Sequence, residues 1–264
     1  MAAAAGPGTF KVIITRKLPP KCQVHFDTET ARLASSGKTI EVLYHDSDEP
    51  LPHDTLVEWA AVGVDGIYCL LSDKISSDVI EASGDSLKVV STMSVGYNHV
   101  DVSACISKQV KVGNTPDALT ETTADLAVGL LLATARRIPE GVAAVKAGEW
   151  TTWKPMWLTG PDVCKSTVGI VGMGRIGTEI AKRLGLGFGC KILYTGGSGP
   201  KPDAEAAAGG AEFRELDALL EESDFVVLAC ALNDKTRHLI GAPQLAKMKK
   251  EAMLVNIARG EVID

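Results

Sequence analysis

The feature that most constrains the fold is the segment Thr167–Leu184, TVGIVGMGRIGTEIAKRL, where a β-type run leads through a glycine-rich turn into a helical pattern. Gly172, Gly174 and Gly177 form G-x-G-x-x-G directly after the strand. The first glycine permits a tight turn, the second lets the backbone approach a pyrophosphate, and the third allows the helix to pack closely on the strand. The helix N-terminus offers N–H groups and a favourable dipole to the phosphates. This context favours a dinucleotide site over a glycine turn without a ligand.

The same alternation of strand and helix patterns runs through the rest of the chain. Before the boundary near Pro116, apolar runs predict five strands, which are FKVIITR, TIEVLY, GIYCLL, LKVVST and VKVG. After it, four strand candidates follow, namely TVGIV, KILYT, FVVLA and AMLVNI. Helical patterns occupy segments such as HDTLVEWAAV, SSDVIEAS and residues 175–184, 216–222 and 243–249. Apolar strands separated by helices predict parallel sheets covered on both faces. We therefore expect an α/β protein with two Rossmann-like or flavodoxin-like domains, the second incomplete.

A long apolar helix is expected at Thr120–Ile138, after the TPDALTET segment whose Pro, Asp and Thr residues signal a helix start. Its nearly continuous Leu, Val and Ala content predicts burial between layers. Its length is close to that of a membrane span. Asp125, Arg136 and Arg137, together with the lack of a second such segment, argue against a membrane role.

Composition narrows the function classes. The 264 residues carry a net charge of -6 with no dominant basic run, so neither nucleic acid nor a membrane surface is an expected partner. The six cysteines are far apart and have no zinc-site spacing, so we expect them to be reduced, mostly buried and without metal, in a cytoplasmic protein. The N-terminal MAAAAGPG lacks a basic start and a long apolar core, so residues 1–8 are expected to form a disordered tail.

The segment after KILYT bears on the choice of cofactor. An NAD site usually places an acidic residue about 20 residues after the glycines, where it holds the ribose hydroxyls. Here Tyr194 and Thr195 are followed by Gly196, Gly197 and Ser198, with Lys201 close behind. No carboxylate would repel a 2′-phosphate, and Ser198 and Lys201 could contact one. The sequence therefore favours NADPH, with NADH possible because no arginine is present to clamp the phosphate.

Several ordered motifs resemble one family. LLSDKI, LKVVSTMSVGYNHVD, TPDALTETTADLAVGLLL, GEWTTWKPMWL, GIVGMGRIG and VNIARG run from about Phe10 to Asp264. Together they are similar to the D-isomer-specific 2-hydroxyacid dehydrogenases, and within that family to its glyoxylate/hydroxypyruvate reductase branch. The resemblance implies a substrate domain at residues 9–117 and an NAD(P)-binding domain at 118–264, with the active site between them. It also implies reduction of hydroxypyruvate to D-glycerate and of glyoxylate to glycolate by the complete enzyme, which would be a homodimer.

The resemblance also implies roles for particular residues. Val95 and Gly96 would offer N–H donors to the carboxylate of a 2-keto acid, and Arg259 would pair with its carboxylate and keto oxygens. A planar guanidinium suits two such oxygens better than an ammonium does. Expected cofactor contacts, beyond the first and third glycines of the turn, are Gly174, Arg175 and Ile176 at the pyrophosphate, Gly197 and Ser198 near the ribose, and Ala231 and Ile257 along the nicotinamide. Ala231 stands where a polar residue is expected.

The family's catalytic histidine and its acidic partner are expected beyond Asp264, so we predict an incomplete, catalytically deficient chain. Of the five histidines here, His99 lies nearest a motif. We expect it to stabilise the turn at Ser94–Gly96, the SVG turn, rather than to act as the general acid. Three roles remain possible for the tryptophans of the Trp-rich loop: a dimer contact, a wall of the substrate site, or packing between the domains. These residues are Trp150, Trp153 and Trp157. A non-enzymatic dinucleotide-binding protein of the corepressor type is the alternative function, and a regulator that dimerises with the full-length enzyme is a third possibility.

Overall fold

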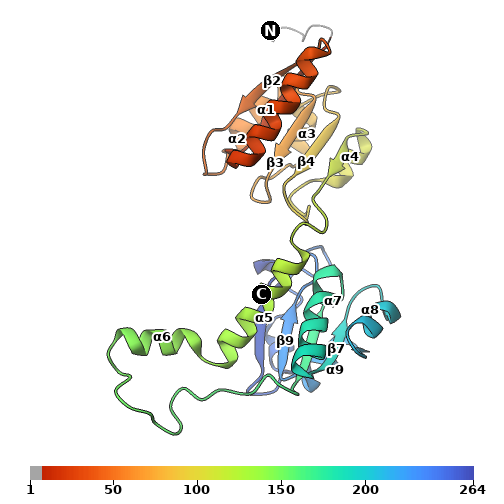
Figure 1. Ribbon diagram of the computed structural model, residues 1–264. Coiled ribbons are helices and arrows are strands. Elements are labelled where there is room, and N and C mark those ends of the chain that lie inside the picture. The colour runs from red at the N-terminus through yellow and green to blue at the C-terminus, as the bar shows by residue number, and fades with distance from the viewer. Residues whose placement is uncertain (1–7) are drawn as a thin grey trace. The chain divides into compact units, whose positions relative to one another are not determined.

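The computed structural model describes residues 8–264 (Figure 1). Contacts between Cα atoms divide the chain into two compact units, of which unit 1 ends at Ala118 and unit 2 spans Leu119–Asp264. Each unit contains one five-stranded parallel sheet, which confirms the expected α/β class with two parallel-sheet domains. The expected disordered tail lies outside the described residues except for Gly8, whose carbonyl accepts a hydrogen bond from the Thr39 N–H.

The sheet of unit 1 has the strand order β2-β1-β3-β4-β5, and all five predicted strands are present. Their bounds are β1 (Thr9–Ile14), β2 (Thr39–Tyr44), β3 (Gly66–Cys69), β4 (Val89–Thr92) and β5 (Lys111–Gly113). This is the flavodoxin-like order, in which the direction of winding reverses between β1 and β3. In open sheets of this kind, ligands bind outside the carboxyl ends of the strands.

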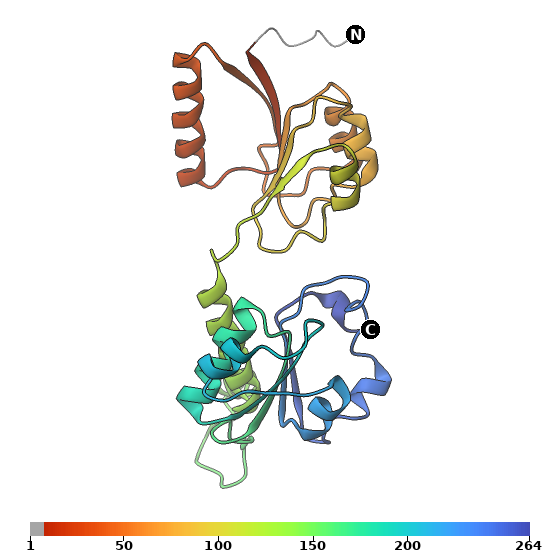
Figure 2. The ribbon, with the colours of Figure 1, turned by 90° about the vertical axis from the view of Figure 1, so that its right-hand side faces the viewer.

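Four helices accompany this sheet: α1 (Pro20–Ser35), α2 (His53–Ala60), α3 (Ser77–Ala82) and α4 (Val102–Ser107). Figure 2 shows α1 on one side of the sheet and α3 and α4 on the other. The core lies on the second side, where Leu56, Ile80 and Cys105 pack against Ile67 and Val90. Helix α1 contains no buried residue, so unit 1 draws its apolar stability mainly from one face of its sheet.

The sheet of unit 2 has the order β10-β9-β6-β7-β8. Its strands are β6 (Thr167–Val171), β7 (Lys191–Thr195), β8 (Glu212–Phe213), β9 (Phe225–Leu228) and β10 (Met253–Asn256). Counted from β6, this is the Rossmann order 3-2-1-4-5, which reverses between β6 and β9. The prediction of four strands was one short, because the two-residue edge strand β8 is too brief to show a hydrophobic pattern.

Both faces of this sheet are covered, as Figure 2 shows. Its helices are α5 (Thr120–Ala135), α6 (Ile138–Lys146), α7 (Arg175–Lys182), a π-helical turn (Arg183–Gly187), α8 (Pro202–Ala207), α9 (Leu216–Glu222), α10 (Ala242–Leu245) and a 3-10 turn (Gly260–Val262). Val168 and Ile170 of β6 pack against the core that includes α5 and α7. Val171 packs with Leu219 of α9 in a second core on the opposite face. Strand residues therefore alternate between two apolar layers.

Helix α5 departs from its prediction in length and burial. It ends at Ala135 rather than Ile138, because Arg137 adopts a left-handed conformation (φ 53°) and the chain turns into α6. Its buried residues form one stripe, whereas Leu126 and Leu130 are exposed, so the expected burial between layers was wrong for that side of the helix. Within residues 8–264 no helix is long and apolar enough to cross a membrane.

Smaller corrections concern other helices and the cysteines. Helix α10 is shorter than the predicted 243–249, and the prediction did not name α6 or α8. Of the six free cysteines, three are buried, but Cys22 and Cys164 are exposed. Both lie at polar surface segments, so the expectation of mostly buried thiols holds for only half of them.

Candidate dinucleotide and substrate site

The glycine-rich turn joins β6 to α7 at the point where the sheet of unit 2 reverses. Gly172 has a φ of 105°, and a Cβ built on it would lie 2.6 Å from the backbone nitrogen of Cys230. The Gly172 N–H donates to the Thr195 carbonyl of the neighbouring strand (2.9 Å). Only glycine suits a position that combines this conformation with such close backbone contact. The first glycine of the motif therefore brings the ends of β6, β7 and β9 together.

The other two motif glycines have different surroundings. A Cβ on Gly177 would lie 2.1 Å from the Gly172 carbonyl oxygen, so glycine is needed for α7 to begin against the turn. A Cβ on Gly174 would meet no protein atom within 4 Å. Gly174 is the N-cap of α7 and has no side-chain cap. The structure thus provides an open helix N-terminus, with room above the second glycine for an anionic group.

A lysine from the loop after β7 lies beside the glycine-rich turn. After β7 the backbone N–H of Lys201 donates to the Tyr194 hydroxyl (2.6 Å), and the Lys201 Nζ donates to the Met173 carbonyl (2.9 Å). The Tyr194 hydroxyl in turn donates to Glu205 (2.5 Å). Burial raises the pKa of Tyr194, and hydrogen bonding to Glu205 adds to this, so the phenol stays neutral and can donate. The ammonium of Lys201 is thereby fixed beside the glycine-rich turn.

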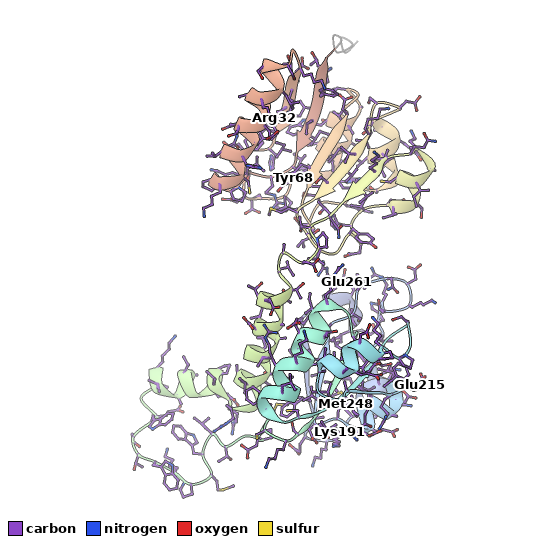
Figure 3. All side chains as sticks on the ribbon, turned by 45° about the vertical axis from the view of Figure 1, so that its right-hand side comes forward. Arg32, Tyr68, Lys191, Glu215, Met248 and Glu261 are labelled. Carbon is purple, nitrogen blue, oxygen red and sulfur yellow. The ribbon has the colours of Figure 1, made fainter. Side chains whose placement is uncertain are left out.

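The ends of β9 and β10 complete this edge of the sheet. The Ala229 N–H donates to the Val171 carbonyl (2.8 Å), and the Ile257 N–H donates to the Leu228 carbonyl (3.1 Å). Ala231 lies three residues beyond β9, and its carbonyl accepts a hydrogen bond from the Thr236 hydroxyl (2.7 Å). In Figure 3, Glu261 marks this carboxyl end of unit 2 and Lys191, at the start of β7, marks the opposite end.

Arg259 lies three residues beyond β10 in a turn that Asn256 organises. The Asn256 side chain accepts from the Ala258 N–H (2.9 Å) and donates to the Arg259 carbonyl (2.8 Å). The Arg259 guanidinium donates to the Ala258 carbonyl (3.0 Å). Within residues 8–264 it forms no ion pair, so its charge is available to an anion. Asn256 was not predicted, although an asparagine at the end of a strand is typical of such a turn.

Val95 and Gly96 lie in unit 1, just beyond the carboxyl end of β4. Both are half-buried, and in the described part of the chain their N–H groups donate no hydrogen bond. The Val95 carbonyl accepts from the Asn114 side chain (2.9 Å). Consecutive backbone N–H groups without a partner are the kind of donors that bind anions in proteins. The two N–H groups that were expected to bind the substrate carboxylate are therefore unpaired within residues 8–264, and their role toward a carboxylate stays a prediction.

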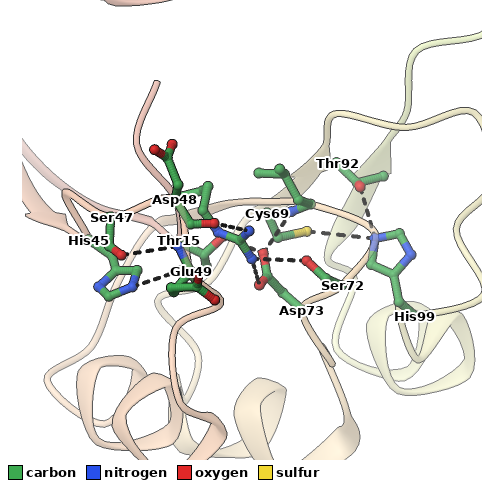
Figure 4. A network of polar contacts seen from close by, with 12 residues as sticks. Thr15, His45, Ser47, Asp48, Glu49, Cys69, Ser72, Asp73, Thr92 and His99 are labelled. Atoms are coloured by element: carbon green, nitrogen blue, oxygen red, sulfur yellow. Dashed lines mark hydrogen bonds and ion pairs between the residues drawn. The ribbon is translucent and has the colours of Figure 1, made fainter. Parts of the chain in front are cut away.

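A second polar network occupies the reversal point of the unit 1 sheet (Figure 4). The buried Asp73 carboxylate accepts from the Thr15 hydroxyl (2.5 Å), the Leu70 N–H (2.8 Å) and the Arg16 guanidinium (3.2 Å). Arg16 also donates to Ser72 and to the Asp48 carbonyl. These bonds join the loops that follow β1, β2 and β3. Asp73, the aspartate of the LLSDKI motif, therefore links these loops structurally and is not open to a ligand.

The predicted cofactor residues converge on one edge. The glycines of the turn, Arg175, Ile176, Gly197, Ser198, Ala231, Ile257 and Arg259 all follow the carboxyl ends of β6, β7, β9 and β10. Val95 and Gly96 follow a strand of the other sheet. Parallel strands in register present their carboxyl ends on the same side, so a single edge collects residues that are far apart in sequence.

A family model supplies the deciding comparison. Residues 128–264 match the model described as "D-isomer specific 2-hydroxyacid dehydrogenase, NAD binding domain". The chain belongs to the D-isomer-specific 2-hydroxyacid dehydrogenase family. The resemblance drawn from the ordered motifs is thus confirmed, and a nicotinamide dinucleotide is the cofactor class of this NAD(P)-dependent oxidoreductase family.

Relatives in this family extend the match over nearly the whole chain. The chain is 46% identical over 255 residues to glyoxylate reductase/hydroxypyruvate reductase of Homo sapiens, covering 96% of this chain and 74% of that protein. It is 42% identical over 262 residues to a glyoxylate reductase of Thermococcus kodakarensis, covering 96% and 73%. Both names are those of reductases, so the corepressor-like alternative is not favoured.

Solved structures of the family share the fold. A glyoxylate reductase from Paecilomyes thermophila has a TM-score of 0.81 at 29% identity, covering 97% of this chain and 75% of that one. D-Lactate dehydrogenase from Aquifex aeolicus, complexed with NAD and lactic acid, has a TM-score of 0.78 at 26% identity, covering 96% and 70%. The two-sheet architecture is therefore that of 2-hydroxyacid dehydrogenases.

Proposed function

We propose that this protein is a glyoxylate/hydroxypyruvate reductase that uses NADPH to convert hydroxypyruvate to D-glycerate and glyoxylate to glycolate. The observation that carries the proposal is the edge of unit 2, where a glycine-rich turn with an open helix N-terminus follows β6. Arg259, which forms no ion pair within residues 8–264, follows β10 of the same sheet. The names of the relatives support the substrate class. The substrate domain is assigned to residues 9–117 and the coenzyme domain to 118–264.

The chain's own residues fit a dinucleotide. The open space above Gly174 leaves room for the pyrophosphate, with Arg175, Ile176 and Gly177 in the first turn of α7 beneath it. Gly172 brings the backbone of the turn against Cys230 and so shapes this surface. Gly197 and Ser198 would contact the ribose, and Ile257 would lie along the nicotinamide. Ala231 would lie there too, but its side chain is only a methyl group. When bound, the cofactor supplies the hydride that adds to the keto carbon.

Two sets of polar groups are proposed to bind the substrate acid. The Arg259 guanidinium pairs with the carboxylate and keto oxygens, and the N–H groups of Val95 and Gly96 donate to the carboxylate. Holding the acid in a fixed orientation contributes to the rate because a misplaced carbonyl loses the advantage of proximity. No residue of this chain is assigned as the general acid.

NADPH rather than NADH is favoured by the charge at the ribose end. The Lys201 ammonium is held at the Met173 carbonyl (2.9 Å), and the loop from Gly196 to Lys201 contains no carboxylate. A 2′-phosphate there would gain an attractive charge and meet no like charge within the loop. Ser198 adds a hydroxyl donor to the same segment.

A homodimer is proposed through the arm formed by α6 and the Trp-rich segment, residues 138–158. In Figure 1 this arm projects from the rest of unit 2. Trp150, Trp153 and Trp157 line a hollow of about 590 Å³ together with Val142 and Val145. The exposed fractions of Trp153 and Met156 are 78% and 81%. Apolar aromatic surface of this extent is typical of an interface, and a second copy would cover it.

A cytoplasmic location is proposed because the cysteines stay unpaired. None of the six is in a disulfide within residues 8–264, and three are buried thiols. Such usage is typical of a reducing compartment.

The test is calorimetric titration of the 264-residue protein with NADPH and with NADH, together with NADPH oxidation in the presence of hydroxypyruvate. We expect NADPH to bind more tightly than NADH and hydroxypyruvate to bind the NADPH complex. Lys201→Gln should weaken NADPH binding about tenfold, the equivalent of ~1.4 kcal/mol, and leave NADH unchanged. Lys191→Gln, at the opposite end of the sheet, is the matched control. Equal affinities for the two cofactors would contradict the NADPH assignment, and absence of keto-acid binding would contradict the function.

A further inference from the structure

Three consecutive carbonyls of the SVG turn are each held by a separate donor. The Ser94 carbonyl accepts from the Thr115 N–H (2.9 Å) and the Val95 carbonyl from the Asn114 side chain (2.9 Å). The Gly96 carbonyl accepts from the Ser94 hydroxyl (2.7 Å). The turn itself belongs to no helix or strand, so these bonds, rather than a ladder, set its conformation.

Holding these carbonyls determines where the substrate donors point. In a trans peptide the N–H lies opposite the C=O of the same plane. The Val95 N–H shares its plane with the Ser94 carbonyl, and the Gly96 N–H shares its plane with the Val95 carbonyl. The segment Asn114–Thr115 therefore anchors the two planes that carry both donors and directs the N–H groups away from itself. Glycine has the greatest backbone freedom, so the Gly96 donor gains most from such anchoring.

The bond to Gly96 continues into a chain of side chains whose direction is fixed. A carbonyl only accepts, so the Ser94 hydroxyl uses its proton on Gly96 and must accept from the Thr92 hydroxyl, 2.8 Å away. The Thr92 hydroxyl then has no proton left for His99, so His99 Nε2 must donate to it (2.8 Å). Figure 4 shows this contact between His99 and Thr92. Thr92 and Ser94 are buried, where such bonds strengthen one another.

A neutral thiol, that of Cys69, lies beside this hydrogen-bond chain. Cys69 lies at the end of β3 with its Sγ 4.0 Å from His99 Nε2. Burial raises the pKa of Cys69 to about 12, so the thiol is neutral at working pH and places no negative charge next to the histidine. The direction from His99 to Gly96 therefore rests on the Gly96 carbonyl, which can only accept a hydrogen bond.

We propose that Asn114 and the chain His99–Thr92–Ser94 are positioning residues that aim the Val95 and Gly96 N–H groups at the carboxylate of the 2-keto acid. The inference rests on the proposed function, because it names residues that act through that function's carboxylate donors. It deepens that function by assigning Asn114, outside the SVG motif, to substrate affinity. His99 acts here as a fixed Nε2–H donor and not as a proton carrier.

The test uses the full chain saturated with NADPH and titrated with hydroxypyruvate. Asn114 is exposed, so Asn114→Ala should fold normally and bind hydroxypyruvate about tenfold more weakly with unchanged NADPH affinity. Asn114→Asp, which replaces the donor by an acceptor, should weaken binding further. Thr92→Val should also weaken binding, whereas Thr92→Ser, which keeps the hydroxyl, should restore it to within about twofold. Ser91→Ala, an exposed serine on the same strand, is the control.

Nitrogen-15 NMR provides a readout that a general loss of structure would not give. In the parent chain, hydroxypyruvate should shift the amide signals of Val95 and Gly96, and His99 should show the Nε2–H tautomer. In Asn114→Ala, the Gly96 response should fall more than the Val95 response. If the parent binds hydroxypyruvate and Asn114→Ala and Thr92→Val bind it equally well, the positioning role is overturned and the proposed function stands. If the parent binds NADPH but no keto acid, the proposed function is overturned and the inference with it.

Discussion

The carboxyl edges of the two sheets are built from different groups. In unit 2 the edge consists of backbone and glycine, with the Gly172 turn pressed against Cys230 and the Gly177 backbone against Gly172. In unit 1 it consists of side-chain hydrogen bonds, with Asp73 joining the loops after β1 and β3 and Thr92 joining His99 to Ser94. The difference indicates that the first edge tolerates no added atoms at Gly172 and Gly177, whereas the second tolerates no lost polar groups.

Gly172→Ala should have the largest effect, because it adds a Cβ to the backbone-built edge. That Cβ would lie 2.6 Å from the Cys230 nitrogen at a φ that side chains rarely adopt. We expect NADPH binding to be lost by more than about a hundredfold, with several kcal/mol of destabilisation. Calorimetry and denaturant unfolding measure both quantities. A Gly172→Ala protein with parental NADPH affinity would show that the edge can adapt to added atoms.

Asp73→Ala removes a charge from the side-chain-built edge and should rank second. It leaves the Arg16 guanidinium, whose side chain is 12% exposed, without its carboxylate and the Thr15 hydroxyl without its acceptor. A broken buried pair of this kind costs about 3 kcal/mol in the free energy of unfolding. Asp46→Ala provides the contrast, because the Lys17–Asp46 pair is exposed and should contribute less than about 1 kcal/mol. If urea unfolding shows that the two substitutions lower the free energy of unfolding equally, the buried Asp73 pair contributes no more than the exposed Asp46 pair and the prediction is wrong.

High pH should destabilise the protein through Cys69 at the unit 1 edge. Burial raises the pKa of this thiol from its ordinary 9.0 to about 12, so the folded state keeps a proton that the unfolded state loses. The stabilisation from the protonated thiol is complete below pH 9 and is lost as the pH rises toward 12. By pH 11 the loss in the free energy of unfolding amounts to about 2.5 kcal/mol. Cys69→Ala should therefore reduce the fall in unfolding free energy between pH 8 and pH 11. Cys22→Ala, at an exposed thiol, should leave the fall unchanged.

Gly174→Ala sharpens the comparison and should have the smallest effect on the protein itself. No protein atom lies within 4 Å of the added Cβ, so stability should change by less than about 0.5 kcal/mol. NADPH affinity should nevertheless fall about tenfold, because the methyl group occupies the space expected for the pyrophosphate. Unaltered affinity with unaltered stability would mean that the phosphates bind elsewhere.

Much of the fold was predictable from local pattern. Nine of the ten strands were identified because buried parallel strands are apolar throughout, and the two-residue β8 escaped because it carries no such pattern. The end of α5 also escaped prediction, since nothing in the apolar run announces the left-handed Arg137. The glycine turn was predictable because its spacing answers a steric requirement that the structure then displays at Gly172 and Gly177.

What the sequence determined by itself is the chemical character of the proposed site: glycines where backbone must approach, an arginine proposed to bind the substrate acid, and a loop after β7 without carboxylates. What only the tertiary structure decided is how those groups are held. Asn114 meets Val95 across 19 positions and Lys201 meets Met173 across 28. Such pairs leave no periodic trace, because strand order and register bring them together, and these depend on long-range packing rather than on neighbouring residues.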